Sequence, residues 1–198
     1  MFNGIIYNQG IIKDIKKNPK YVSGSLVIEV TSNIKFNKTD IGESVCCNGV
    51  CLTLTNVNNC YISFYLSKET LDKSNFKYCK VNQTVNLEKS LSYGKKISGH
   101  YIQGHIDTTA RVSNIILKDG TWIVSFLLPK ALRRYIIEKG SIGINGVSLT
   151  ISKITKNNFQ INIIPHTLKL TNLFKLKKNS YVNIEFDIFN KYLIKLKK

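Results

Sequence analysis

The sequence predicts an all-β protein made of two similar, small antiparallel barrels followed by one C-terminal helix. The first observation is a repeat: residues 44–55 and 141–152 share the pattern Asn-Gly-Val-x-Leu-Thr, with the Asn-Gly pairs at 48–49 and 145–146. The second is that each copy holds about six short apolar segments separated by glycine and asparagine turns, which is typical of small barrels. The third is that the last residues are apolar at helical intervals.

The repeat continues without a gap for some forty residues at an offset of 97. A chain of 198 residues with a repeat of about half its length is a duplicated domain. We therefore divide it into barrels at 1–97 and 98–187 and a helix at 188–198. Matched positions are Cys51 with Ser148, Thr53 with Thr150, Thr70 with Thr167, Asn75 with Asn172, Val85 with Val182, and Glu88 with Glu185.

The first copy is read from its β-branched runs and turn residues. It gives a buried first strand within residues 2–12, a strand at 25–30, a polar loop at 33–40, a strand at 61–66, a short helix capped by Ser67, and a closing strand at 85–87.

The hairpin at 45–55 is the clearest local signal, because both central residues of a type I′ turn need positive φ and Asn-Gly supplies them. Its second strand has a period of two, so Cys51 and Thr53 share one face and the apolar residues share the other. Such a strand is often only half-buried, with one solvated side. The pairing of a reactive cysteine with a threonine favours a pocket wall instead.

The second copy opens at 98–107, where aligning Gly4 with Gly104 changes the offset to 100. Its predicted elements are a strand at 121–128, a helix at 129–138 with proline at its start and Gly140 after its end, a strand at 159–164, a counterpart of the short helix at 165–168, and a terminal helix at 188–197.

Composition limits the possible functions. The net charge is +17, from 29 basic and 12 acidic residues, which would suit a nucleic-acid binder. The lysines are spread along the chain, however, and Asn and Ile are also abundant, so we favour compositional bias over specific nucleic-acid binding.

Neither a membrane helix nor a secretion signal is recognisable, which predicts a soluble cytoplasmic protein. The five cysteines are an odd number, so a disulfide framework is not expected. Cys47 and Cys51 have loose metal-ligand spacing, but no second pair matches them, and no metal site is predicted.

With these motifs in order, the chain resembles the α-type riboflavin synthases, which make riboflavin from 6,7-dimethyl-8-ribityllumazine. The resemblance covers nearly the whole chain. Asn3 stands where that family usually has threonine, and His166 where it often has glutamate. The stretches that carry the resemblance are residues 1–6, 48–53, 99–107, 139–150 and 164–168.

The resemblance implies two six-stranded Greek-key barrels and a homotrimer joined by the C-terminal helices. Each barrel would bind one lumazine, and the active site would lie between the first barrel of one subunit and the second barrel of the next. One lumazine would give a four-carbon unit to the other, yielding riboflavin and 5-amino-6-(D-ribitylamino)uracil, without metal or organic cofactor. Lumazine synthase would be a further partner.

The implied catalytic residues are His105, Cys51, Ser148, Thr150, Asp187 and Ser44. Histidine is the side chain best suited to carry a proton near neutral pH, which makes His105 a candidate for proton transfer, and Cys51 is a nucleophile or a polar contact. His100 is expected to be structural, because five residues along a regular strand it faces away from His105. Trp122 and Tyr135 are expected to pack. Implied substrate-binding residues are Gly4, Ile5, Ile6, Cys51, Leu52, Thr53, Tyr65, Leu66, Ser67, Lys68, Glu69, Thr70, Gly104, His105, Ile106, Lys139, Ser148, Leu149, Thr150, Asn162, Ile163, Ile164, Pro165, His166 and Thr167.

Two other functions fit the same fold. A non-catalytic lumazine- or flavin-binding antenna protein needs only one working pocket, whereas both copies here keep Asn-Gly-Val-x-Leu-Thr and the threonines at 70 and 167. A nucleic-acid-binding barrel would need clustered basic residues interleaved with aromatics on one sheet, and the sequence has no such cluster.

Overall fold

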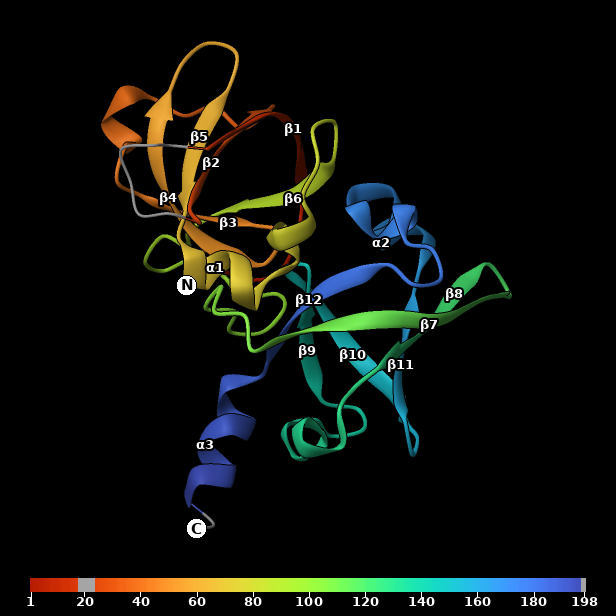
Figure 1. Cartoon of the computed structure of the whole chain (residues 1–198). Coiled ribbons are helices and arrows are strands. Elements are labelled where there is room, and N and C mark those ends of the chain that lie inside the picture. Colours follow the sequence, from red (N-terminus) through yellow and green to blue (C-terminus); the bar gives the residue numbers. More distant parts are fainter. Residues whose placement is uncertain (18–23, 197–198) are drawn as a thin grey trace.

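The computed structural model describes residues 1–17 and 24–196 and contains two closed six-stranded antiparallel barrels. Helix α3 (Ile188–Leu196) extends away from both barrels (Figure 1). The predicted fold class is therefore confirmed. Within the described ranges, no helix is both long and apolar enough to cross a bilayer.

The two barrels have the same strand order. Around the first barrel it is β1-β2-β5-β4-β3-β6, and around the second it is β7-β8-β11-β10-β9-β12. The strands of the first are β1 (Asn8–Lys17), β2 (Leu26–Ser32), β3 (Ser44–Cys47), β4 (Val50–Val57), β5 (Ile62–Leu66) and β6 (Thr84–Lys89). Those of the second are β7 (Thr108–Lys118), β8 (Thr121–Leu127), β9 (Ser141–Ile144), β10 (Val147–Ile154), β11 (Asn158–Ile163) and β12 (Tyr181–Phe186). The short helices are η1 (Lys38–Asp40), α1 (Lys68–Lys73), η2 (Asn75–Tyr78), η3 (Lys130–Tyr135), α2 (Pro165–Leu170) and η4 (Asn172–Lys175).

The local signals of the sequence are confirmed where they rest on turn chemistry. The Asn-Gly pairs take positive φ at both residues, 52° and 86° in the first hairpin and 47° and 80° in the second. The Ser67 side chain accepts a hydrogen bond from the Thr70 N–H and caps α1. Tyr135 stacks on Phe186, and Trp122 packs against the second core, as expected.

Four expectations were wrong in detail. Only the second half of the stretch 2–12 expected as the first strand belongs to it, because β1 begins at Asn8 and continues to Lys17. The predicted helix at 129–138 is the shorter 3₁₀ helix η3, whose bonds run from residue i to i−3 and which ends where Ile136 turns into the core. The loop at 33–40 contains η1. The segment holding His100 is not a regular strand; only its Ile102 forms a bridge, to Phe2.

Two segments cross between the barrels. We call residues 1–7 the first crossing segment and residues 98–106 the second. Ile6 packs in the core of the second barrel, and Ile106 packs against the core of the first. The two segments meet each other where the Phe2 and Ile102 backbones exchange hydrogen bonds of 2.7 and 3.2 Å. Each barrel is therefore completed by a segment that precedes the other barrel's strands.

Six buried asparagines join the barrels in pairs that follow the repeat. Four side chains form a closed amide ring, in which Asn48 donates to Asn75, Asn75 to Asn145, Asn145 to Asn172, and Asn172 back to Asn48, at 2.7–3.5 Å. The other two, Asn86 and Asn183, bond to backbone groups across the interface. Every bond that these asparagines make from the first barrel to the second has a counterpart in the reverse direction, so this part of the interface has approximate two-fold symmetry.

The Asn-Gly turns lie at the centre of this interface. A Cβ atom at Gly49 would lie 2.6 Å from the Gly146 backbone nitrogen, and one at Gly146 would lie 2.9 Å from that of Gly49. Only glycine permits this approach, and positive φ makes other residues costly here in any case. The repeated motif is therefore a contact between the barrels as well as a hairpin turn.

Replacing Asn172 with alanine should lower the free energy of unfolding by about 3 kcal/mol, because it leaves Asn48 Oδ1, Asn145 Nδ2 and the Thr84 carbonyl without that partner inside the interface. Urea denaturation followed by circular dichroism measures the change. The matched control is Asn59→Ala in the exposed β4–β5 turn, which should stay within about 0.5 kcal/mol of the unmodified protein. Equal effects of the two substitutions would contradict a stabilising role for the ring.

Candidate functional site

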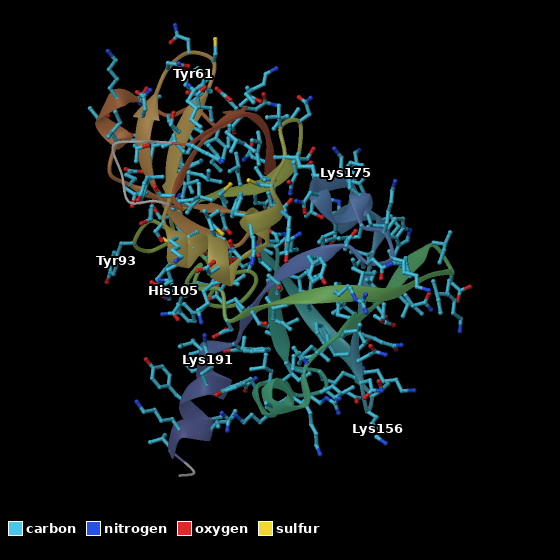
Figure 2. All side chains as sticks on the ribbon, viewed as in Figure 1. Tyr61, Tyr93, His105, Lys156, Lys175 and Lys191 are labelled. Atoms are coloured by element: carbon cyan, nitrogen blue, oxygen red, sulfur yellow. The ribbon has the colours of Figure 1, made fainter. Side chains whose placement is uncertain are left out.

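A cleft of about 250 Å³ opens on the first barrel between β4, α1 and the second crossing segment. Its lining includes Cys51 and Thr70 from the barrel and Gly104, His105 and Ile106 from the crossing segment. Figure 2 shows His105 below α1 in this view, at the surface of the molecule. The structure thus brings five of the predicted contact residues together with His105, namely Cys51, Glu69, Thr70, Gly104 and Ile106, although His105 belongs to the second copy in sequence.

The Gly104 backbone sets the distance between the crossing segment and β4. Its carbonyl accepts a 2.8 Å hydrogen bond from the Cys51 N–H. A Cβ atom at Gly104 would lie 2.6 Å from the Cys51 Cβ atom, and φ is +81°, so glycine is required. This contact places His105 beside Cys51 at the mouth of the cleft.

Glu185 fixes the second crossing segment to its own barrel. Its carboxylate accepts hydrogen bonds from the N–H groups of Gln103, at 2.6 Å, and Gly104, at 2.9 Å. Burial raises the pKa of this carboxyl to about 7, and the two backbone donors oppose that rise. The charged form is costly to bury, but it matches the two donors that hold the segment.

Three cysteines lie on the hairpin, and their environments differ. Cys46 and Cys47 are buried, and burial raises the pKa of both thiols. A thiol with a raised pKa forms little of the reactive thiolate. Cys51 is half-buried and faces the cleft, so it is the thiol of this hairpin that a bound molecule can reach.

The second barrel repeats this arrangement with different side chains. The Ser148 N–H donates to the Gly4 carbonyl at 2.8 Å, as Cys51 does to Gly104. Glu88 accepts from the N–H groups of Asn3, at 2.8 Å, and Gly4, at 3.0 Å, and burial raises its pKa. By the offset of 100, Ile5 occupies the place of His105. The two sites therefore share a backbone frame and differ in their chemistry.

His100 contacts Ser148, which the sequence reasoning missed. The His100 Nδ1 atom lies 2.7 Å from the Ser148 Oγ atom, and the imidazole is largely buried. No periodicity marks this contact in the sequence, because the segment that carries His100 is irregular. The expectation that His100 is purely structural rested on a strand that does not form.

The remaining predicted residues are distributed around the two sites. Asp187 immediately precedes α3, and its carboxylate accepts a hydrogen bond from the Phe189 N–H at 2.9 Å. Ser44 lies opposite Thr53 in the β3–β4 pair and does not line the cleft. Predicted residues that are buried are Gly4, Ile6, Leu52, Leu66, Gly104 and Ile163. Those that are half-buried are Ile5, Ser44, Cys51, Tyr65, Ser67, Thr70, Ile106, Ser148, Leu149, Thr167 and Asp187. Those that are exposed are Thr53, Lys68, Glu69, His105, Lys139, Thr150, Asn162, Ile164, Pro165 and His166.

Comparison with known sequences identifies the repeated unit. A family model described as the lumazine binding domain matches residues 3–90 and again residues 103–187. The riboflavin synthase of Actinobacillus pleuropneumoniae is 38% identical over 194 residues, which are 98% of this chain and 88% of that protein. The riboflavin synthase of Escherichia coli K12 is 37% identical over 188 residues, which are 94% of this chain and 87% of that protein.

Solved structures with the same architecture contain bound ligands. LumP in complex with riboflavin is 31% identical, covers 94% of this chain and 99% of its own, and superposes with a TM-score of 0.80. LumP in complex with 6,7-dimethyl-8-(1′-D-ribityl) lumazine is 29% identical, covers 93% and 98%, and superposes with a TM-score of 0.79.

The titration of Glu185 gives a prediction about stability. Its pKa is about 7 in the folded protein and ordinarily 4.5, so the folded state holds the proton more tightly. The stability that this adds is present below pH 4.5 and is lost as the pH rises through 7, a change of about 3 kcal/mol. The unfolding free energy of the unmodified protein should therefore fall relative to that of Glu185→Gln between pH 4.5 and 7.5. Urea titrations at several pH values measure both, and parallel profiles would contradict the assignment.

Proposed function

The chain belongs to the riboflavin synthase family, and we propose that each of its barrels binds one molecule of 6,7-dimethyl-8-ribityllumazine. A four-carbon unit passes from one molecule to the other, giving riboflavin and 5-amino-6-(D-ribitylamino)uracil. The observation that carries the proposal is the pair of sites with one backbone frame and different side chains. A reaction between two copies of one molecule needs two similar pockets, and the donor and the acceptor need different treatment.

In the first barrel, His105 and Cys51 carry the proposed chemistry. The reaction needs a nucleophile, or an activated water, that adds to the methyl-bearing ring carbon of one lumazine, and a base that removes a proton from a methyl group of the other. Histidine is the side chain best suited to proton transfer near neutral pH. Cys51 is the accessible thiol beside it. Thr70 lies in the same cleft and can hydrogen-bond the heterocycle.

In the second barrel, Ser148, Thr150 and Thr167 hydrogen-bond the other lumazine. Holding both molecules in place removes much of the entropic cost of a bimolecular step, up to about 7–11 kcal/mol in favourable cases. We assign the two barrels to residues 1–97 and 98–187, with the site on each barrel completed by the crossing segment of the other copy. We assign assembly to residues 188–198, of which 197 and 198 lie outside the described part of the chain.

The site is completed by a second subunit. His105 is exposed at the mouth of an open cleft, and a wall from another subunit would shield the reacting groups there from bulk water. We assign the missing wall to the second barrel of a neighbouring subunit in a cytoplasmic homotrimer. Helix α3 supplies exposed apolar side chains for this assembly, and its Lys191 forms a 3.0 Å ion pair with Asp107. The exposed side chains are Phe189, Tyr192, Leu193 and Leu196.

Lumazine synthase would act as a partner by supplying the substrate.

The second candidate is a binding protein without catalysis. It is favoured by the similarity to LumP in its complexes with lumazine and riboflavin. The curated relatives at 37–38% identity are riboflavin synthases, and both barrels here retain the site frame. Turnover of lumazine alone distinguishes the two functions, because a binding protein would bind lumazine and form no riboflavin.

Cys51→Ser and His105→Gln should each lower the rate of riboflavin formation by about a hundredfold while changing lumazine affinity less, since both act in chemical steps. Absorbance at the riboflavin band measures the rate, and fluorescence titration measures the affinity. An unchanged rate in either variant would remove that residue from the mechanism. Binding without turnover in the unmodified protein would support the second candidate.

The double substitution Leu193→Asp with Leu196→Asp should convert the trimer into monomers, because charged groups cannot be buried unpaired in a helix interface. Sedimentation equilibrium measures the mass, and turnover should fall with it. The control is Ile116→Asp with Leu117→Asp, an exposed apolar pair on β7 that should leave the trimer intact. Monomeric mass in the unmodified protein would refute the proposed assembly.

A further inference from the structure

Ser148 is held in place twice by residues that the sequence separates widely. Its backbone N–H bonds to the carbonyl of Gly4, and its hydroxyl lies 2.7 Å from His100 Nδ1. The two contacts come from different crossing segments. Both its main chain and its side chain are therefore set by groups outside the second barrel's strands.

Asn3 joins these two crossing segments. Its side-chain Oδ1 atom accepts hydrogen bonds from the N–H groups of Ser98 and Gly99, both at 2.7 Å. The backbone of Asn3 is itself fixed by Glu88. A Cβ atom at Gly99 would lie 2.2 Å from the Asn3 carbonyl oxygen and 2.7 Å from the Ser148 Cβ atom, so this residue must be glycine. Asn3 thus fixes the backbone of the two residues that directly precede His100.

The first barrel does not have this arrangement. Gln103 occupies the position of Asn3 by the offset of 100, and Glu185 holds its backbone in the same way. Within residues 1–17 and 24–196, however, neither the Gln103 side chain nor the Cys51 thiol makes a side-chain hydrogen bond. The link from Asn3 through His100 is therefore a difference between the two sites, not a consequence of the repeat.

The hydrogen-bond partners of the imidazole indicate its tautomer. Within the described part of the chain, the Nε2 atom of His100 is buried and has no hydrogen-bond partner. A buried N–H without a partner is rarer than an unpaired acceptor, so the proton belongs on Nδ1. Burial lowers the pKa of His100, with the charge of Asp187 opposing, which keeps the ring neutral. His100 then donates to Ser148 Oγ, and the serine hydroxyl is free to donate outward.

We propose that Asn3 and His100 are positioning residues that turn the Ser148 hydroxyl proton toward a carbonyl oxygen or ring-nitrogen acceptor of the lumazine in the second barrel. A serine hydroxyl rotates freely and can donate one hydrogen bond and accept two. With His100 donating to it, the hydroxyl presents a donor to the ligand. The inference rests on the proposed function only for the identity of this ligand.

A double-mutant cycle tests whether His100 acts through Ser148. His100→Leu should lower kcat/KM about tenfold, which corresponds to one ordinary hydrogen bond. His100→Asn should restore most of this loss, because its amide donates from the position of Nδ1. In a Ser148→Ala background, adding His100→Leu should lower kcat/KM by less than about a further twofold, because the effects of coupled groups are not additive. Independent, multiplying losses would overturn the proposal, as would a His100→Asn variant as slow as His100→Leu.

Asn3 is tested by one substitution that removes its acceptor oxygen and one that keeps an acceptor oxygen. Asn3→Leu removes the acceptor for Ser98 and Gly99 and should lower kcat/KM about fivefold, somewhat less than a whole hydrogen bond to the ligand. Asn3→Thr keeps an acceptor oxygen and should stay within about twofold of the unmodified protein. Asn59→Leu, at the far rim of the first barrel, is the surface control and should have no effect. Equal rates for Asn3→Leu and Asn3→Thr would overturn the role of Asn3.

Melting temperatures show whether each variant folds. If His100→Leu does not fold, the two Asn3 variants still test the inference. If the unmodified protein forms no riboflavin, the proposed function fails, but the inference is still tested by fluorescence titration with lumazine. His100→Leu and Ser148→Ala should then weaken lumazine binding to the same extent, and together no further. Unchanged lumazine affinity in both variants would overturn the inference independently of turnover.

Discussion

The close contact between the two Asn-Gly turns is the constraint on which the rest of the structure depends. Hairpin turns normally lie at the surface, where water satisfies their backbone groups. Here Asn48 and Asn145 are 1% and 4% exposed, so the protein itself must supply those partners. The amide ring and the bonds of Asn86 and Asn183 do this across the interface. A buried amide network is costly unless every member is paired, which fixes the relative orientation of the barrels narrowly.

That orientation makes the exchange of segments possible. With the turns in contact, residues 1–7 and 98–106 lie along the interface, and each carries a glycine against a strand of the opposite barrel. Glu88 and Glu185 hold these segments with two backbone hydrogen bonds each. Each candidate site therefore combines one strand residue, Cys51 or Ser148, with one residue from a crossing segment. Side chains that meet in a site come from both copies of the repeat.

The sequence predicted the features that depend on local chemistry. The hairpins, the Ser67 cap, the duplication and the terminal helix follow from turn residues and periodicity, and they are confirmed. The crossing segments did not follow, because residues 1–7 and 98–106 have no periodicity and their partners are distant in the chain. The pattern of Pro129 and Gly140 correctly placed a helical turn but could not distinguish a 3₁₀ helix from an α-helix. The contact of His100 with Ser148 was missed for the same reason as the exchange of segments.

The approximate two-fold axis through the amide ring relates the two halves as it would relate two identical subunits. The contacts are isologous, in that each group on one half meets the symmetry-related group of the other, and the exchanged segments correspond to those of a domain-swapped dimer. Joining the halves in one polypeptide keeps the symmetric interface but releases the two sites from being identical. A dimer of separate chains would have to place the same residue at both Cys51 and Ser148. The single chain can therefore hold two copies of one molecule in unequal surroundings, which a symmetric dimer of identical chains could not do.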